Sequence, residues 1–255
     1  MERVIDAPSN DLVRAYIKTM GAELRTYRGK VPPHMFSQWG LPMAAAGLSG
    51  VPYPIMKIVN GGCRMEVREH LPAGEPLEVT TQLVDIDDDG RRAVMHQVIT
   101  TGRVGREPSV IAHLYPIVVY GERKGGEKRE RPRVAEDARE LEVFDIAPSD
   151  AVDFAMLTGD FNPIHWLKPY AKISGFDSTI LHGFASMSWA IEGVQRHLYG
   201  GEAAVRVCDA RFVRPMALPA RVGLYVSEER EGGERDVWMG ESPGGLAYMK
   251  ATMSA

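Results

Sequence analysis

Apolar and polar positions divide the chain into two similar series of elements. The second half opens with a β-prone run at 141–146, and Ser149 and Asp150 then offer helix-start chemistry. A loop rich in Gly, Asn and Pro follows at 159–163, and an uncharged stretch at 178–191 predicts a buried helix. Four strand-like runs complete this half, at 205–213, 221–227, 235–239 and 246–252.

The first half repeats this order. Its uncharged stretch lies at 31–56, and strand-like runs follow at 62–67, 76–86, 92–101 and 109–120. Val67-Arg68 and Val213-Arg214 lie 146 positions apart, and the same shift places the first uncharged stretch over the second. The shared order predicts an internal duplication.

A helix that is apolar nearly all round must be covered on most sides, which a sheet wrapped around it achieves. Each half is therefore predicted to be an α+β unit with a central apolar helix. Two such units side by side could join their sheets edge to edge and remove an exposed edge strand.

Residues 122–140 separate the halves. Thirteen of these nineteen side chains are charged, with both signs interleaved, which is typical of a solvated linker. The predicted organisation is a first domain at 1–121, a linker at 122–140 and a second domain at 141–255.

Composition excludes several classes of protein. The net charge of −4 argues against a general nucleic-acid binder. Two cysteines, Cys63 and Cys208, cannot form a disulfide framework or a four-cysteine zinc site, and they are expected to be buried strand thiols. The first residues are acidic rather than basic and apolar, and the uncharged run between Lys30 and Lys57 holds five prolines. We therefore expect a cytoplasmic protein with neither a membrane nor a nucleic acid as partner.

The segment with the most chemistry is the loop that carries Asp160, Asn162 and His165. Gly159 lets the chain leave a helix, and Pro163 stiffens the loop. Asp160 and His165 can then converge, and a carboxylate hydrogen-bonded to an imidazole holds and activates water. Asn162 is expected to orient one of them.

Gly183 is predicted at the N-terminus of the buried helix. Backbone N–H groups are unpaired there, and they can bind a carbonyl oxygen that gains negative charge. The sequence has no Gly-x-Gly-x-x-Gly, no P-loop and no Gly-x-Ser-x-Gly, so nucleotide folds and serine hydrolases of that type are unsupported.

Residues 158–165, TGDFNPIH, resemble the hydratase-2 motif of the MaoC-like dehydratases. Residues 174–176 and 180–183 resemble its continuation, and 211–215 resemble the strand that follows the central helix in that family. The resemblance covers 141–255. It implies two tandem hot-dog units, and hydration of trans-2-enoyl thioesters to (3R)-3-hydroxyacyl thioesters or the reverse dehydration.

The resemblance also implies roles. Asp160 and His165 would hold the water and supply the α-carbon proton, Asn162 would orient the site, and the Gly183 amide would bind the thioester carbonyl. No metal or organic cofactor is implied, since the coenzyme A or phosphopantetheine thioester is itself the substrate. Further substrate-binding candidates are His182, Phe184, Ser186, Arg214 and Lys168.

The sequence departs from the family in two places. Leu167 stands where many members have an acid, and the first half has no copy of the loop. In tandem relatives the first half houses the acyl chain, and the resemblance implies the same here. Methionines and small residues could line such a tunnel: Met35, Met43, Met56 and 44–46.

Several alternatives stay open at this stage. Asp160, His165 and His182 could form a two-histidine, one-carboxylate iron site. The protein could also be a non-catalytic acyl-thioester binding protein or a hot-dog thioesterase. A monomer and a homodimer of double units are both compatible with the sequence, as are coenzyme A and acyl-carrier protein.

Overall fold

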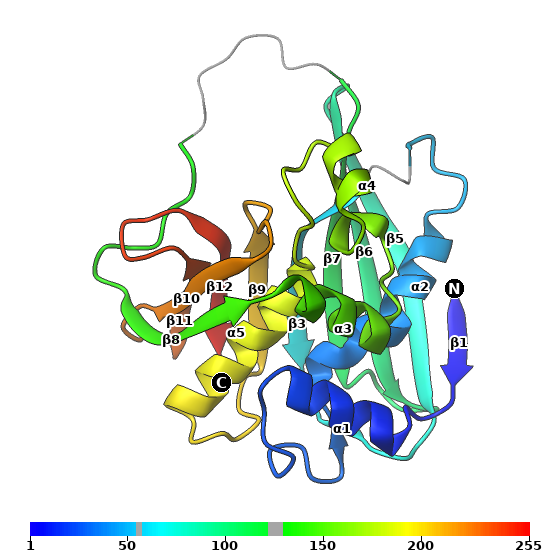
Figure 1. The fold of residues 1–255 in the computed structure, drawn as a ribbon. Coiled ribbons are helices and arrows are strands. Elements are labelled where there is room, and N and C mark those ends of the chain that lie inside the picture. Colours follow the sequence, from blue (N-terminus) through cyan, green and yellow to red (C-terminus); the bar gives the residue numbers. More distant parts are fainter. Residues whose placement is uncertain (55–57, 122–129) are drawn as a thin grey trace.

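One antiparallel sheet forms the frame of the molecule (Figure 1). The computed structural model describes residues 1–54, 58–121 and 130–255, and ten strands within these ranges make up this sheet. Five come from the first half, in the order β1 (Glu2–Ile5), β5 (Leu77–Asp88), β6 (Arg92–Arg103), β7 (Val110–Val119) and β3 (Val59–Val67). Five come from the second half, in the order β9 (Val207–Phe212), β12 (Ala247–Ser254), β11 (Glu234–Gly240), β10 (Ala220–Val226) and β8 (Arg139–Ile146).

The halves mirror each other, which confirms the predicted duplication. Read from each outer edge, β1-β5-β6-β7-β3 corresponds to β8-β10-β11-β12-β9. The helices α1 (Asn10–Thr19) and α2 (Ser37–Gly47) correspond to α3 (Pro148–Thr158) and α5 (Gly183–Leu198). The shift of 146 positions places the first residue of α2 on the first residue of α5. The remaining elements are short: β2 (Lys30–Val31), η1 (Pro33–Phe36), β4 (Leu71–Pro72), η3 (Pro163–His165) and α4 (Lys168–Ile173).

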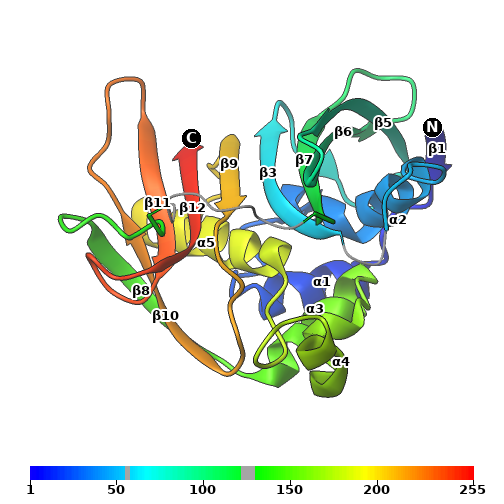
Figure 2. The ribbon, with the colours of Figure 1, turned by 90° about the horizontal axis from the view of Figure 1, so that it is seen from above.

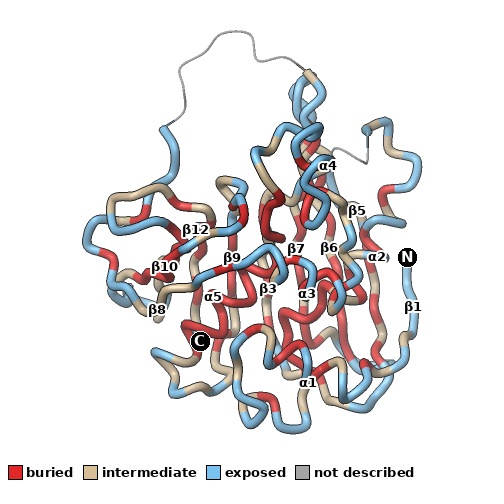
Figure 3. The backbone as a smooth tube through the Cα atoms, viewed as in Figure 1, coloured by how far each residue is buried: buried red, intermediate tan, exposed pale blue. Residues whose placement is uncertain are grey.

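Each half-sheet curls around its own helix, α2 in the first half and α5 in the second (Figure 2). Successive strand residues point to opposite faces, so alternate side chains such as Met249, Ala251 and Met253 are buried against α5. Residues 184–195 of α5 are buried without a break, as expected for a helix covered on most sides (Figure 3).

The half-sheets join where β3 pairs with β9, as predicted. Cys63 of β3 and Cys208 of β9 are both fully buried free thiols at this seam. Burial raises the pKa of both thiols, so they are inert packing residues.

Gly62 is needed for the close approach of the two strands at this seam. A Cβ at this position would lie 2.6 Å from the Ala210 carbonyl oxygen, and backbone cannot move as freely as a side chain. We expect Gly62→Ala to lower the free energy of unfolding by about 1–3 kcal/mol, as overpacking does. Urea unfolding measures this, with Glu66→Ala on the outer face of the same strand as the control. Equal stability of the two variants would show that the seam tolerates a wider spacing.

Helix α1 was not predicted from the sequence, although its signals are present. Ser9 caps it by accepting a hydrogen bond from the Leu12 amide, and Val13, Tyr16 and Ile17 are buried at helical spacing. Its Tyr16 hydroxyl lies 2.9 Å from Ser188 Oγ of α5, while α3 contacts both α1 and α2. Each half thus packs its first helix against the other half.

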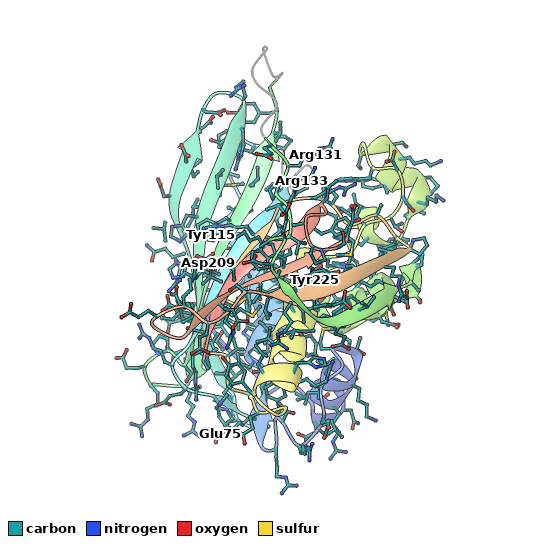
Figure 4. The ribbon with its side chains drawn as sticks, turned by 90° about the vertical axis from the view of Figure 1, so that its left-hand side faces the viewer. Glu75, Tyr115, Arg131, Arg133, Asp209 and Tyr225 are labelled. Carbon is teal, nitrogen blue, oxygen red and sulfur yellow. The ribbon has the colours of Figure 1, made fainter. Side chains whose placement is uncertain are left out.

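The predicted linker at 122–140 differs from a fully solvated segment. Residues 122–129 lie outside the described residues, but in 130–140 Val134 is 1% exposed and Ala138 is also buried, and β8 already begins at Arg139. Val134 and Ala138 pack against Tyr225 and Trp238 on the outer face of the sheet. Figure 4 shows Arg131 and Arg133 on the same side of the molecule as Tyr225. A few apolar residues among many charges are enough to anchor the segment. The domain boundaries remain a prediction.

The described part of the uncharged stretch at 31–56 contributes to the core. It forms η1 and α2, and Met35 and Phe36 are fully buried. None of the helices in the described ranges has both the length and the apolarity needed to cross a membrane.

Candidate active site

The loop after α3 is shaped by its own backbone. Gly159 has φ of 77°, a left-handed conformation that ends the helix. Asn162 Oδ1 accepts a hydrogen bond of 3.3 Å from the Ile164 amide and so caps η3. The described contact of the Asn162 side chain is with the loop backbone, so it holds the loop in shape. That it also orients Asp160 or His165 stays a prediction.

His165 is buried at the end of this loop. Its Nδ1 lies 2.8 Å from the Ile180 carbonyl oxygen, and because a carbonyl only accepts, Nδ1 carries the proton. Burial lowers the pKa of His165, while the nearby Asp160 carboxylate acts in the opposite direction. The ring is therefore neutral at pH 7, and its Nε2 presents a lone pair that can take a proton.

Asp160 lies close to this ring, but the predicted hydrogen bond between carboxylate and imidazole is absent among the described residues. A ligand atom of Asp160 and one of His165 lie within 4.8 Å, whereas Asp160 Oδ1 accepts a long bond of 3.4 Å from the Asn162 amide. The reason is that Ile180 engages Nδ1 of the ring. A bridging water fits this separation, so the two groups can hold one water between them.

His182 contacts both His165 and the Asp160 backbone. It is the N-cap residue of α5, its ring stacks on His165 with centroids 3.6 Å apart, and its Nε2 donates to the Asp160 carbonyl oxygen at 3.0 Å. Burial lowers the pKa of His182 well below its usual value, and the neighbouring His165 lowers it further. Asp160, His165 and His182 place ligand atoms within 4.8 Å of one another, so geometry leaves the metal-site alternative open.

The lowered pKa values of His165 and His182 predict that the folded state becomes less stable as the pH falls. Both bind protons less readily when folded than when unfolded, so the unfolded state takes up more protons as pH falls below about 6.5, and stability falls with it. We expect the midpoint of thermal unfolding to drop between pH 7.5 and about pH 5.5, with a shallower drop in His182→Asn.

The exposed His197 serves as the control for this series. His197→Asn removes a histidine outside the site, next to Glu142, and is measured alongside as the comparison. A His182→Asn slope equal to that of His197→Asn would contradict the assignment.

Gly183 begins α5, as predicted. The first intrahelical bond runs from the Ser186 amide to the His182 carbonyl oxygen, so the amides of residues 183–185 have no partner within the helix. A Cβ on Gly183 would lie 2.7 Å from the Phe212 ring, which explains why glycine is required. The free amides and the helix dipole can stabilise a developing oxyanion.

A cavity of about 650 Å³ opens over these groups. Asp160, Asn162, His165 and Gly183 line it, together with the predicted binding residues His182, Phe184, Ser186 and Arg214. Its apolar walls from the second half include Ile164, Ile180, Leu181, Phe212 and Met216.

Lys168 does not line the cavity, so the structure does not support it as a binding residue. It is the exposed first residue of α4. Arg214 lies on the wall, but its guanidinium is 2.8 Å from the Glu241 carboxylate and lies over the Tyr248 ring. Its charge is thus already partnered, which weakens it as a phosphate ligand. Tyr248 itself lines the cavity and was missed, because nothing in its strand sequence distinguishes it.

The first half lines the cavity too, partly as predicted. Ala44 and Ala45 of α2 contribute to it, with Leu41, Leu48, Leu114 and Pro116. Met35 and Met43 are buried in the main core and do not line the cavity. Met56 lies outside the described residues.

A second polar cluster was missed by sequence reasoning. Glu192 of α5 is 3% exposed and accepts hydrogen bonds from Tyr27 at 2.6 Å and Gln195 at 3.1 Å. His34 of η1 is 2.8 Å from the same carboxylate and 3.0 Å from the Tyr16 hydroxyl. Glu192 and Gln195 in an otherwise apolar helix were the available signal. This cluster lies between the two halves and does not line the cavity.

Comparison with known proteins gives a family match for residues 126–241, which fit the MaoC like domain. The 3-hydroxyacyl-thioester dehydratase Y of Mycobacterium tuberculosis is 32% identical over 174 residues, which cover 62% of this chain and 58% of the relative. A probable enoyl-CoA hydratase 2 of Dictyostelium discoideum is 25% identical over 176 residues, covering 66% of this chain and 60% of the relative. The chain therefore spans less than two thirds of these relatives' length.

Solved structures agree on the fold. The crystal structure of HtdX from Mycobacterium tuberculosis superimposes with a TM-score of 0.81 at 21% identity, over 100% of this chain and 99% of the other. A conserved hypothetical protein of the same organism, described as a double hot-dog fold, gives 0.62 at 13% identity, over 99% and 95%. The predicted double hot-dog architecture is confirmed.

Proposed function

Because this chain carries a MaoC-like domain, we propose that it hydrates trans-2-enoyl thioesters to (3R)-3-hydroxyacyl thioesters and catalyses the reverse dehydration. One observation supports the proposal above others: Asp160, His165 and the free amide end of α5 line a single, mainly apolar cavity. A base, a water position and an oxyanion site are what addition of water to a conjugated thioester requires. Relatives named 3-hydroxyacyl-thioester dehydratase and enoyl-CoA hydratase 2 support the same chemistry.

Each group has a defined part in this reaction. Asp160 and His165 hold the water, and His165 Nε2 takes one of its protons while the oxygen bonds to the β-carbon. The double-bond electrons shift to the thioester oxygen, where the Gly183 amide donates to the developing enolate. The protonated His165 then returns the proton to the α-carbon, so one O–H bond breaks and a C–O and a C–H bond form.

We propose that no metal or organic cofactor takes part. The thioester carbonyl already polarises the double bond. The helix amides donate hydrogen bonds to the developing oxyanion, which a metal ion would otherwise stabilise. Metal analysis of the purified protein and turnover in EDTA test this: unchanged turnover is expected. Loss of turnover in EDTA, restored by iron or zinc, would instead support a metal at Asp160, His165 and His182.

The deciding experiment follows loss of enoyl absorbance with trans-2-enoyl-CoA and identifies the product's stereochemistry with an enzyme specific for (3R)-3-hydroxyacyl-CoA. The product is expected to be the (3R) isomer. Thermal stabilisation by enoyl-CoA without turnover would favour a non-catalytic binding protein, and release of free coenzyme A would favour a thioesterase. Carrier-protein thioesters run in parallel would separate the two carriers.

A cytoplasmic location and a monomer or a dimer of double units complete the proposal. Two buried, unpaired cysteines suit a reducing compartment. Cell fractionation tests the location, and sedimentation of the purified chain tests the assembly.

A further inference from the structure

Gln97 of β6 lines the large cavity within the first half. It is 1% exposed on the inner face of β6, and its Nε2 donates a hydrogen bond of 2.8 Å to the Ala44 carbonyl oxygen of α2. This carbonyl belongs to the last turn of the helix, which cannot satisfy it internally. The amide therefore crosses from sheet to helix and closes the space between them.

A second, more open hollow of about 370 Å³ lies nearby, lined by Met1, Glu2, Gly47 and residues 80–83 of β5. A Cβ on Gly47 would lie 3.4 Å from Gln97 Nε2 and 4.0 Å from Thr81 Oγ1. On the sheet, Gln97 pairs with Leu114, which lines the large cavity, and with Leu83, which lines the second. The Gln97 side chain thus lies between residues that line the two cavities.

We propose that Gln97 sets the maximum length of acyl chain and that the substrates are medium-chain enoyl thioesters, an inference that rests on the proposed function. The oxyanion amide of Gly183 lies beside Phe212 on β9, and β6 is three strands away, about 14 Å at roughly 4.8 Å per strand. An extended chain advances about 1.3 Å per carbon for C–C bonds of about 1.5 Å, so roughly ten carbons reach Gln97.

Because the Gln97 side chain is polar and hydrogen-bonded, we expect the limit on acyl-chain length to be sharp. A longer chain would have to displace the amide, which would leave the Ala44 carbonyl and the Gln97 N–H groups buried without partners. An apolar side chain at this position would lose only packing when it moved. A buried amide is therefore a firmer stop than a leucine or methionine of similar size.

The test compares kcat/KM for trans-2-enoyl-CoA of about 4 to 16 carbons in wild type, Gln97→Ala and Gln97→Met. Wild type is expected to lose about tenfold or more beyond 12 carbons, a loss typical of a misfit in an apolar pocket. Gln97→Ala removes the side chain that limits the cavity and is expected to recover most of that loss. Gln97→Met keeps the volume but loses the hydrogen bond to Ala44, so it is expected to recover a smaller part. Val98→Ala, on the opposite face of the same strand, keeps the wild-type profile.

A second readout does not depend on turnover. Thermal stabilisation by saturated acyl-CoA of the same lengths reports binding alone, and its dependence on length is expected to change in the same way. Gln97→Ser serves if Gln97→Ala does not fold. An unchanged length dependence in the shortened variants overturns the role of Gln97. Absence of turnover in wild type overturns the proposed function instead, and the binding series then still decides the role of Gln97.

Discussion

Replacing Asp160 by asparagine or His165 by glutamine is expected to lower kcat for enoyl-thioester hydration by about 10²- to 10⁴-fold, the range of a lost acid–base group. His165 is held with its Nδ1 proton on the Ile180 carbonyl, so only Nε2 can accept a proton from water. In the proposed mechanism Asp160 holds the other side of that water. Because neither change alters the apolar core, the far-ultraviolet spectrum and the melting temperature at pH 7.5 should stay close to those of wild type. Single-turnover rates with saturating enoyl-CoA measure the effect on the chemical step.

Matched substitutions on the surface provide the controls. Asp177→Asn and His197→Gln change the same residue types at exposed positions and should keep wild-type rates. Near-wild-type turnover in both active-site variants would exclude the proposed mechanism. A loss confined to KM would place the two residues in binding rather than in proton transfer.

The second large effect concerns stability. Glu192→Leu is expected to lower the free energy of unfolding by about 3–5 kcal/mol, because it leaves the buried His34, Tyr27 and Gln195 groups without their common acceptor. The exposed Glu202→Leu should change it by less than about 0.5 kcal/mol. Urea unfolding measures both.

A double-mutant cycle separates the network from simple packing. Glu192→Ala and His34→Ala together should cost less than the sum of the single variants, because the second change removes a group that the first has already stranded. Additive costs would mean that the two side chains stabilise the fold independently.

Periodicity and motif spacing predicted the strand runs, the buried helix and the duplication, because each element has a sequence signal of its own. The prediction that Gly183 begins the buried helix is confirmed, because a helix start is a local property of the sequence. Contacts between the halves could not be predicted in this way. The pairing of His34 with Glu192 depends on how η1 meets α5, 158 residues further along the chain.

In the candidate site, too, local features could be predicted from the sequence and contacts between distant residues could not. The loop from Asp160 to His165 was identified from its sequence, but the hydrogen bond of His165 to Ile180 was not, because a backbone carbonyl leaves no mark in a sequence. Lys168 was chosen for its charge and proximity in sequence, yet α4 presents it to solvent.

The mirrored strand order has an evolutionary consequence. In a symmetric dimer of single units, every substitution appears twice, so a residue that improves one site must be tolerated at its symmetry mate. Fusion into one chain lifts that restriction, because positions 146 apart can be changed independently. Ser37 and Gly183 stand at corresponding positions, yet only one begins a helix that faces reactive groups. Independent change would allow one copy to carry the proposed acid–base groups while the other lines the cavity without them.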